Sequence, residues 1–254
     1  MGGDLLQMAR FYVSRSSITG DIITISGNDV SHIKNVLRLV PGEEIVVCDG
    51  HSTDYAAVIE TIGKNAVISK IISISKNLNE SPVVINLFQG LPKSDKMDYI
   101  VQKCTELGVS RIFPVMTNRT VIKINSHGDE KKKLERWRRI SLEASKQSSR
   151  GLVPVVEDLI SFDNAIEKAM DISDLAILAY ENEKKGKLKD LLKDSEAKNI
   201  SVFIGPEGGF ETDEVKAAEK LGIVPFKMGP RILRTETAGL AVLSAVMYEL
   251  GDIG

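Results

Sequence analysis

Two glycine-rich segments near the C-terminal end carry the residue types best suited to chemistry. The first, 205–209, reads Gly-Pro-Glu-Gly-Gly and follows the apolar run 200–204; the second, 228–237, follows the apolar run 224–227. Both runs contain β-branched residues and end at Gly-Pro, so each segment is expected to turn sharply at a strand end. In an open α/β sheet, ligands bind beyond the carboxyl ends of the strands, where glycine lets backbone groups approach them. We therefore expect both loops to line one cofactor pocket.

Neither segment contains a common nucleotide-binding motif. The G-x-G-x-x-G frame of dinucleotide sites is absent from both, and so is the phosphate loop G-x-x-x-x-G-K-[ST]. A different cofactor is therefore indicated. The alternative is that Gly208 and Gly209 only form a tight turn before a helix at 211–221, and the presence of the second loop weakens that alternative.

Together the two loops resemble the signature of the RsmE-type 16S ribosomal RNA uridine-N3 methyltransferases, members of the SPOUT, or trefoil-knotted, superfamily. Further similar segments follow in the expected order along the chain, at 32–38, 93–98, 102–109, 135–137 and 143–150. Two positions depart from the family pattern. Residues 1–7 precede its usual start and look like an extra leader. Glu211 stands in place of a helix-capping serine, a role that Thr212 could take over.

The resemblance implies a site for S-adenosylmethionine (AdoMet). The residues that would bind it come from a strand end and from both loops: Leu178, Ala179, Tyr180, Gly205, Pro206, Glu207, Gly208, Gly209, Met228, Gly229, Arg231, Ile232, Leu233, Thr235 and Thr237. Backbone groups would hold the adenine, and Ile232 and Leu233 would cover it. Both aliphatic residues could equally belong to the core.

The reaction implied by the resemblance requires one proton to be managed. Uridine N3 is a poor nucleophile while protonated, so a base must remove the proton or cations must stabilise the anion. The candidate catalytic residues are Arg234, ranked first for charge stabilisation, Glu236, Glu207 and Arg119. Arg234 and Glu236 could instead form a structural ion pair. Because N3 lies on the Watson–Crick edge, the target base must be unpaired or flipped out.

Several cations are candidates for RNA contact. Residues 131–150 are rich in Lys and Arg on a predicted helix whose apolar face includes Leu134 and Trp137. Charge alone favours a solvated face paired with acids, whereas the family resemblance favours RNA. The RNA-binding candidates are Arg10, Lys34, Arg38, Lys93, Lys96, Arg119 and Arg150. For Arg38 the alternative is an internal ion pair beneath a helix that plugs the small N-terminal domain.

Composition limits the class of protein. The chain has 254 residues, 43% of them hydrophobic, and a net charge of −2, which suits a globular protein of one large or two modest domains. Two cysteines and three scattered histidines favour neither a disulfide framework nor a metal site. No apolar run approaches the roughly 20 residues of a membrane span. We expect a cytoplasmic protein without metal or membrane contact.

Two domains are predicted. Residues 8–75 contain short β-like runs (22–25, 44–48, 55–59, 66–69) and one helix (32–39), which indicates a small β-barrel; the resemblance makes it PUA-like and RNA-binding. Residues 82–254 alternate strands (84–88, 111–115, 153–156, 175–179, 200–204, 224–227) with helices, the pattern of a parallel α/β domain. The resemblance adds the SPOUT-type knot at the C-terminal end. Residues 76–81 would be the linker.

The last predicted helix, about 235–250, is apolar almost all round and must be buried on several sides. Burial inside its own domain is one solution, and a homodimer through this helix, which the resemblance favours, is the other. The partners implied by the resemblance are 16S ribosomal RNA or the small ribosomal subunit.

Overall fold

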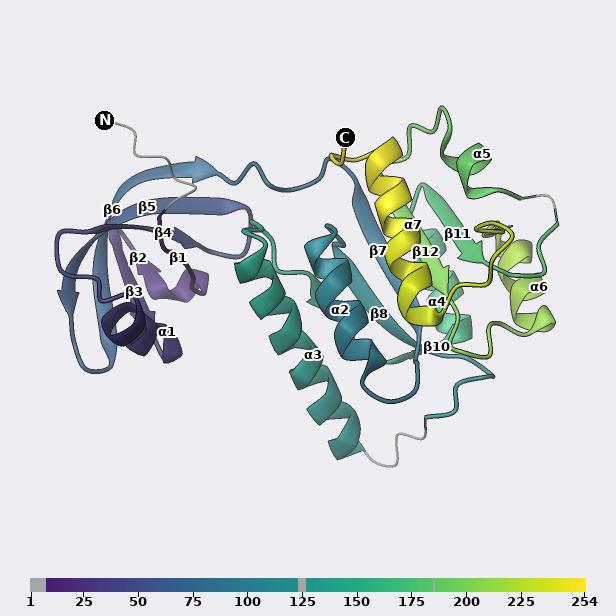
Figure 1. The fold of residues 1–254 in the computed structure, drawn as a ribbon, viewed down its shortest axis with the longest axis horizontal. Helices are drawn as coiled ribbons and strands as arrows, with labels where there is room; N and C mark the ends of the chain where they lie inside the picture. Colours follow the sequence, from purple (N-terminus) through teal and green to yellow (C-terminus); the bar gives the residue numbers. More distant parts are fainter. Residues whose placement is uncertain (1–7, 123–126, 185) are drawn as a thin grey trace. The chain divides into compact units, whose positions relative to one another are not determined.

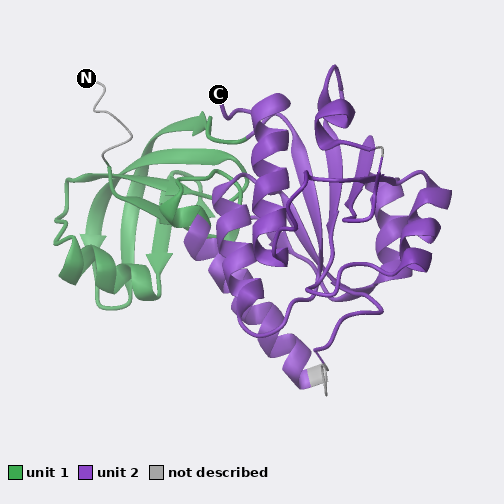
Figure 2. Ribbon diagram, turned by 45° about the vertical axis from the view of Figure 1, so that its right-hand side comes forward, with its two compact units in different colours: residues 1–80, 145–153 green, residues 81–144, 154–254 purple. Residues whose placement is uncertain are grey.

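The computed structural model describes residues 8–122, 127–184 and 186–254. They form two compact units, one containing the chain up to Glu80 together with Ser145–Val153, the other containing Ser81–Ala144 and Pro154–Gly254 (Figure 2). The predicted boundaries, 8–75 and 82–254, differ from these units because Ser145–Val153 belongs with the first. The Glu80 carboxylate accepts hydrogen bonds from the backbone N–H groups of Gly151 (2.7 Å) and Leu152 (2.9 Å). Backbone contacts of this kind leave no mark in the sequence pattern.

The first unit is built on a six-stranded sheet in the order β1-β4-β5-β6-β3-β2. Its strands are β1 (Arg10–Tyr12), β2 (Ile18–Thr19), β3 (Ile22–Ser26), β4 (Glu44–Cys48), β5 (Thr53–Ile62) and β6 (Ala66–Lys76), with a short turn of 3-10 helix, η1 (Arg15–Ser17). Only the β1–β4 pair is parallel. Because β1 and β2 lie at opposite ends of the strand order, the predicted barrel is a half-barrel. Its core contains Ile23, Ile45 and Val47, all fully buried.

The helical segment of the first unit begins and ends earlier than predicted. Helix α1 (Asn28–Ser31) continues into one turn of π-helix, η2 (His32–Val36). The prediction of a helix over 32–39 is wrong for its last three residues, because η2 ends at Val36 and Arg38 has a left-handed backbone with φ +55°. Ile33 is fully buried and fixes this segment to the sheet.

The second unit is a parallel sheet of seven strands within the described residues, in the order β10-β8-β7-β12-β11-β13 with β9 beside β8 (Figure 1). The strands are β7 (Val84–Gly90), β8 (Arg111–Met116), β9 (Val155–Val156), β10 (Ile160–Ser161), β11 (Leu175–Ala179), β12 (Asn199–Ile204) and β13 (Val224–Phe226). The predicted α/β domain is thus confirmed. Strand 153–156 is shorter than predicted, and the two-residue β10 carried too little pattern to be recognised.

Helices cover both faces of this sheet. They are α2 (Lys96–Glu106), α3 (His127–Gln147), α4 (Phe162–Ile172), α5 (Leu188–Leu192), α6 (Thr212–Leu221) and α7 (Thr235–Glu249). Neighbouring residues of β7 show the alternation of a strand: Leu87 belongs to the core under α2, α3 and α7, whereas Phe88 belongs to the core under α4 and α6. In the latter core the Phe88 ring stacks on Phe113, with 4.4 Å between centroids.

Helix α6 starts in a way that the sequence did not predict. Glu211, and not Thr212, is the capping residue, and its backbone N–H donates to the Glu214 carboxylate at 2.8 Å. A carboxylate in the first turn suits the positive end of a helix. Glu211 therefore caps the helix in place of the family's serine, and α6 still begins directly after the first glycine loop.

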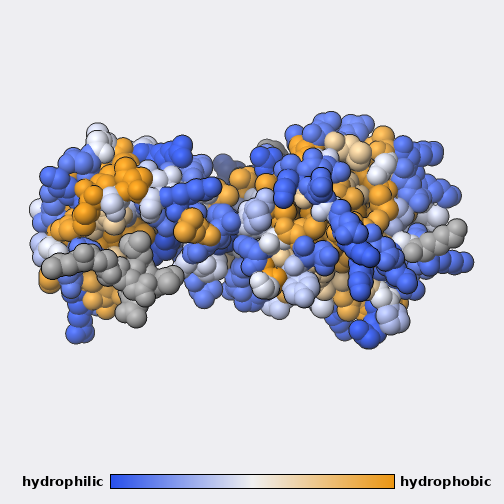
Figure 3. All heavy atoms as spheres, turned by 90° about the horizontal axis from the view of Figure 1, so that it is seen from above, coloured by the Kyte–Doolittle hydropathy of each residue, from blue (hydrophilic) through white to orange (hydrophobic). Residues whose placement is uncertain are grey.

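Hydrophobic side chains also reach the surface, as the face drawn in Figure 3 shows by patches of hydrophobic residues among hydrophilic ones. The most exposed large hydrophobic residues include Val36, Ile74, Leu78, Ile232 and Tyr248. Within the described residues, no helix is both long enough and apolar enough to cross a membrane, and no group of three or more potential metal ligands occurs.

Candidate functional site

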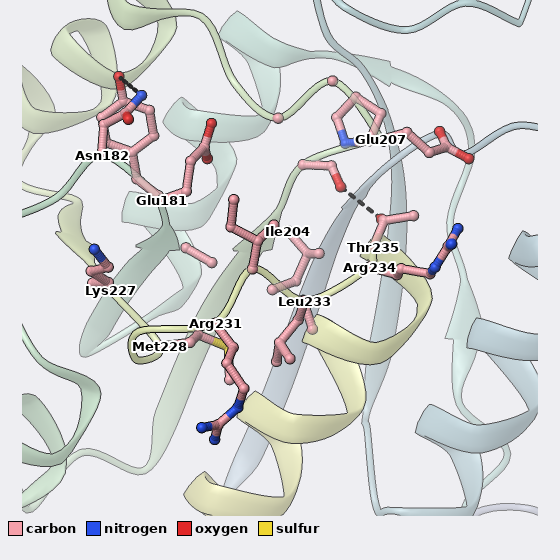
Figure 4. A pocket seen from close by; sticks show the side chains of 18 of the residues that line it. Glu181, Asn182, Ile204, Glu207, Lys227, Met228, Arg231, Leu233, Arg234 and Thr235 are labelled. Atoms are coloured by element: carbon pink, nitrogen blue, oxygen red, sulfur yellow. Dashed lines mark hydrogen bonds between the residues drawn. The ribbon is translucent and has the colours of Figure 1, made fainter.

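A pocket of about 710 Å³ lies at the carboxyl ends of β11, β12 and β13. Its walls come from 179–182 after β11, from 204–209 after β12 and from 227–235 after β13 (Figure 4). Lys96 and Ala238 also line it. The structure therefore brings together the two glycine loops that the sequence analysis singled out. A volume in this range suits a ligand of cofactor size.

Thr235 ties the two loops together. Its hydroxyl donates to the Gly205 carbonyl oxygen at 2.7 Å, the dashed line beside Thr235 in Figure 4, and accepts from Gln89 Nε2 at 2.9 Å. Gln89 Nε2 also donates to the Gly90 carbonyl oxygen at 2.9 Å. Because Gln89 is fully buried and Thr235 is 5% exposed, this chain of hydrogen bonds is shielded from water and fixes the first loop to the start of α7.

Close backbone packing explains two glycines at the pocket floor. A Cβ on Gly90 would lie 2.6 Å from the Pro206 ring, and a Cβ on Gly205 would lie 3.0 Å from the Gly209 backbone. No side chain larger than hydrogen fits either position without displacing backbone. The loop at the end of β12 is therefore built against the end of β7, and its shape depends on both glycines.

Lys96 bridges two carboxylates beside the pocket. Its Nζ lies 2.9 Å from Glu207 Oε1 and 3.3 Å from Glu236 Oε2. Glu207 also accepts from the backbone N–H of Lys93 at 3.0 Å. Burial acts to raise the pKa of Glu207, but the hydrogen bonds from Lys96 and Lys93 hold that pKa below its usual value. The hydrogen bond to Glu207 raises the pKa of Lys96, so both groups stay charged at neutral pH.

Arg234 does not form the ion pair with Glu236 that the sequence analysis gave as an alternative. It is an exposed residue of the pocket wall directly before α7, and it makes no ion pair with Glu236 or with any other residue in the part of the chain that the structure describes. The alternative of an Arg234–Glu236 structural pair is wrong, because the partner of Glu236 is Lys96. A guanidinium without a counter-ion is available to a ligand or a substrate.

Arg119 reaches the first loop from outside the pocket. Its Nη1 donates to the Gly208 carbonyl oxygen at 2.7 Å. A Cβ on Gly208 would lie 3.2 Å from the Cβ of Arg119. Gly208 therefore makes room for the Arg119 side chain.

Most of the predicted cofactor-binding residues line the pocket. Those that do are Ala179, Tyr180, Gly205, Pro206, Glu207, Gly208, Gly209, Met228, Gly229, Arg231, Ile232, Leu233 and Thr235. Leu178 does not, because the alternation of β11 turns its side chain into the core under α4 and α6. Thr237 does not either, since it lies exposed on α7. Ile232 is 86% exposed, so the alternative that it is a core residue is wrong.

Four polar residues of the site were missed. Glu181, Asn182 and Lys227 line the pocket (Figure 4), and the Glu181 carboxylate lies 3.1 Å from the place that a Cβ on Gly209 would occupy. Glu181 and Asn182 directly follow β11, so the rule that ligands bind at carboxyl ends of strands could have found them. Gln89 lies inside a strand, and no signal in the sequence separates it from a surface residue.

The predicted RNA contacts of the first unit fall into two groups. Arg10 is paired with Asp54 at 2.6 Å. Arg150 is 4% exposed and paired with Glu80 at 2.7 Å; its predicted place on an exposed helix face is wrong because α3 ends at Gln147. In contrast, Lys34 and Arg38 are exposed, and neither side chain has a partner among the described residues. The alternative of an internal ion pair for Arg38 is therefore wrong.

The amphipathic helix is confirmed, and some of its cations are paired. Leu134 and Trp137 are buried as predicted. Arg136 pairs with Asp98 and Arg138 pairs with Asp158. Lys131, Lys132 and Arg139 are exposed and have no ion pair within the described ranges. Of the other candidates, Lys93 is exposed next to the pocket, Lys96 forms its wall, and Arg119 holds the first loop.

Each of the two units matches a known protein family. Residues 79–247 match an RNA methyltransferase domain family, and residues 25–72 match an RNA methyltransferase PUA domain family. The chain is 36% identical to the ribosomal RNA small subunit methyltransferase E of Bacillus subtilis over 89% of this chain and 90% of that one. These matches agree with the predicted PUA-like and α/β units.

Two solved structures are similar over nearly the whole chain. The ribosomal RNA small subunit methyltransferase E of Neisseria gonorrhoeae, bound to S-adenosyl methionine, is 32% identical with a TM-score of 0.84 and covers 98% of this chain and 100% of its own. A methyltransferase of Legionella pneumophila, solved with the bound cofactor SAM, is 30% identical with a TM-score of 0.84 and covers 97% and 100%. The SPOUT-type fold class with a PUA-like unit is thereby confirmed.

Proposed function

This chain belongs to the ribosomal RNA small subunit methyltransferase E family, and on that premise we propose that it transfers a methyl group from AdoMet to N3 of a uridine in 16S ribosomal RNA. The observation that carries the proposal is the pocket between the two glycine loops, with an unpaired arginine on its wall and Lys96 bridging Glu207 of the wall to Glu236 beside it. The family supplies the cofactor and the class of RNA. The geometry of the pocket supports the roles that we propose for its residues.

The residues of the pocket fit AdoMet. Ile204, Ile232 and Leu233 offer apolar surface to an adenine ring. Glu181 offers carboxylate oxygens to hydroxyl and ammonium groups, and no described side chain pairs with it. A carboxylate without a cation near it also suits a ligand that carries a positive sulfonium. When bound, AdoMet supplies an activated methyl group, so the protein's contribution is to position the target and to manage one proton.

We assign the proton to Glu236. Its side chain is 21% exposed, and Lys96, 3.3 Å from Oε2, holds the carboxylate in place. A carboxylate that is held in this way and is partly exposed can accept the N3 proton of a uridine placed at the pocket mouth. Glu207 keeps Lys96 oriented through its 2.9 Å contact, so we treat Glu207 and Lys96 as positioning residues.

Arg234 is the proposed stabiliser of charge. Loss of the N3 proton leaves a negative imide whose charge is shared with the two neighbouring carbonyl oxygens. A guanidinium that is not neutralised by a carboxylate stabilises such a charge better than the paired Lys96. Arg231, which also lines the pocket and is exposed, is a matched control for the loss of a cation.

Two experiments test this function. Mass spectrometry of small-subunit RNA nucleosides, from cells with and without the gene, should show N3-methyluridine disappearing when the gene is absent, and an unchanged amount would refute the proposed target. With purified protein, Glu236→Gln should slow methyl transfer by about 10²- to 10⁴-fold and make the rate rise with pH as the substrate ionises by itself. A pH profile identical to that of the wild type would remove Glu236 from the role of base.

Arg234→Gln should lower the rate constant of the bound complex far more than Arg231→Gln. AdoMet affinity, measured by calorimetry, should change little in Arg234→Gln if the arginine acts on the substrate. Equal effects of the two substitutions on the rate would show that Arg234 contributes only to the general positive charge of the pocket rim.

We further propose that the enzyme is a homodimer through α7. Val242, Leu243 and Val246 of this helix are buried in its own unit, yet Tyr248 is 70% exposed and Ala241 and Ser244 are half-buried. Obligate interfaces commonly bury on the order of 2,000 Å² or more. Light scattering of dilute protein should therefore give twice the chain mass, and a monomer at micromolar concentration would contradict the dimer. The proposed RNA substrate also implies work in the cytoplasm.

A further inference from the structure

The tip of the second glycine loop carries an aliphatic side chain that is almost fully open to solvent. Ile232 is 86% exposed, more than any other large hydrophobic residue among the described residues of the second unit. Its neighbours Pro230 and Arg231 are also exposed, whereas Met228 and Leu233 on either side of them are half-buried. Ile232 lines the cofactor pocket, but most of its surface faces away from the pocket walls.

The loop holds Ile232 in a fixed place. Before the tip, the backbone N–H of Lys227 donates to the Gly186 carbonyl oxygen at 2.9 Å. After the tip, two backbone N–H groups in the first turn of α7 donate to the Arg234 carbonyl oxygen, both at 2.8 Å. Pro230 restricts the backbone between these two anchors. The exposure of Ile232 is therefore a property of an anchored loop.

Two cations flank Ile232. Arg231 and Arg234 are exposed, and within the described ranges neither forms an ion pair. Their side chains extend from the loop in different directions (Figure 4). A partner that covers Ile232 must also compensate these charges, so it must be anionic. An RNA strand is anionic and offers apolar base faces as well, whereas an apolar protein surface would leave both arginines without counter-ions.

The proposed reaction needs an apolar side chain at this place. Uridine N3 lies on the Watson–Crick edge, so the base must leave its stack to reach the pocket. Its departure opens a gap between the two neighbouring bases, and isoleucine is one of the side chains that proteins insert between bases as a wedge. Ile232 is two residues from Arg234, so their Cα atoms are at most about 7 Å apart. A wedge here acts directly beside the proposed chemistry.

We propose that Ile232 fills the place that the target uridine leaves in its RNA stack and so keeps the base in the pocket. Ile232 is then a positioning residue, because it touches the neighbours of the target and not the reacting atoms. The proposal rests on the proposed function, which supplies the RNA and the base. Three other roles predict different results: a wall for AdoMet, a general contact with RNA, and a contact with a second copy of this chain.

Kinetics with unmethylated small ribosomal subunits separate these roles. Ile232→Ala should lower kcat on the order of tenfold, while the KM for subunits and the AdoMet affinity stay near their wild-type values, because the wedge acts after both have bound. Ile232→Leu keeps the size of the side chain and should retain most of kcat.

Three results would overturn the proposal. Weaker AdoMet binding by Ile232→Ala in calorimetry would make Ile232 a wall of the cofactor pocket. A higher KM for subunits at an unchanged kcat would make it a general RNA contact. Wild-type kcat in Ile232→Ala would show that the uridine stays in the pocket without a wedge.

Leu221→Ala is the matched control for the loss of an exposed aliphatic side chain. Leu221 is 43% exposed at the end of α6, which connects the carboxyl end of β12 to the amino end of β13. Because both strands are parallel to β11, Leu221 lies at the edge of the sheet opposite to the pocket. Its replacement should leave kcat, KM and AdoMet affinity unchanged.

A photo-crosslink identifies what Ile232 touches. Benzoylphenylalanine replaces Ile232 in the full-length protein, which is bound to unmethylated small subunits and irradiated. We expect adducts with the nucleotides directly beside the methylated uridine, mapped by primer extension, and none there when Leu221 is replaced instead. Adducts formed only with distant nucleotides, with a ribosomal protein or with a second copy of this chain would contradict the wedge.

The outcome remains separate from that of the proposed function. If the uridine target were wrong, N3-methyluridine would persist in cells that lack the gene, whereas the crosslink would still lie beside the nucleotide that the enzyme methylates. If Ile232 were not a wedge, N3-methyluridine would still disappear in those cells.

Discussion

Replacing Thr235 by valine should loosen the cofactor pocket without changing its shape or volume. The substitution is isosteric and removes only the hydroxyl that joins the Gly205 carbonyl oxygen at 2.7 Å to Gln89 Nε2 at 2.9 Å. The Gly205 carbonyl then lacks a partner inside a partly buried region, which costs about 1–2 kcal/mol. Gln89 keeps its bond to the Gly90 carbonyl oxygen, so the second loss costs about 1 kcal/mol. Together the two losses should lower the free energy of unfolding by about 2–3 kcal/mol.

The single tryptophan of the chain reports this change. Trp137 is buried in the core under α3, so its fluorescence during urea unfolding follows the second unit. We expect Thr235→Val to lower the urea midpoint at an unchanged slope, since the exposed surface on unfolding is the same, and calorimetry should show weaker AdoMet binding. Thr235→Ser keeps the hydroxyl, so it should retain most of the urea midpoint and most of the AdoMet affinity of the wild type.

Thr237→Val is the matched control on the same helix. Thr237 is exposed, and surface substitutions usually change stability by no more than about 0.5 kcal/mol. If Thr235→Val unfolded at the same urea concentration as Thr237→Val and bound AdoMet as the wild type does, the hydrogen-bond chain would not be what fixes the first loop.

Three further outcomes are expected. Gly205→Ala should abolish measurable AdoMet binding, because its Cβ would lie 3.0 Å from the Gly209 backbone. The control is Gly20→Ala, at a position with φ +61° and nothing within 4 Å of the added Cβ. It should cost only about 1–2 kcal/mol of stability for the left-handed backbone and leave AdoMet binding intact. Burial raises the pKa of Cys48 to about 11 and that of Cys104 to about 12, so iodoacetamide at pH 8 should label neither thiol before unfolding, and rapid labelling of native protein would contradict their burial. Above pH 9 the unfolded chain loses thiol protons that the folded protein keeps, so the free energy of unfolding, measured by urea titration, should fall as pH rises from 9 to 11; a stability that rises over this range would contradict the direction of these shifts.

The strands and loops of the second unit were predictable because their signals are local. Runs such as 200–204 and 175–179 alternate with helices of ordinary length, and Gly-Pro marks the end of two of them. Because both glycine loops follow such strands, the same signals also predicted that the two loops line one pocket. The knotted class came from the resemblance, because a periodic pattern does not encode the path of the chain through space.

The parts that were missed depend on contacts between distant residues. Gln89 is important only because Thr235 lies 2.9 Å from it, 146 residues along the chain. Lys96 was placed among the RNA-binding cations, and only the structure shows it between two carboxylates. Leu178 was assigned to the pocket because it lies at a strand end, but alternation along β11 turns it into the core.

The same reason explains the error at Arg150. Its charge and its place after a basic helix suggested an exposed residue, whereas Arg150 is buried and the half-buried Glu80 neutralises it. A charged side chain is seldom buried unless it is paired, and the partner is 70 residues away.

The discontinuous make-up of the first unit has a consequence for synthesis of the chain. Gly151 accepts from Ser52 N–H at 2.8 Å, and a Cβ on it would lie 2.5 Å from that of Asn77, so 145–153 completes a unit whose other strands end by Lys76. At about 5 to 20 residues per second, translation from Glu80 to Val153 lasts on the order of 4 to 15 s. During that time the Glu80 carboxylate has none of its final partners. The N-terminal half-barrel leaves the ribosome first, but it is finished only when the middle of the chain has followed it.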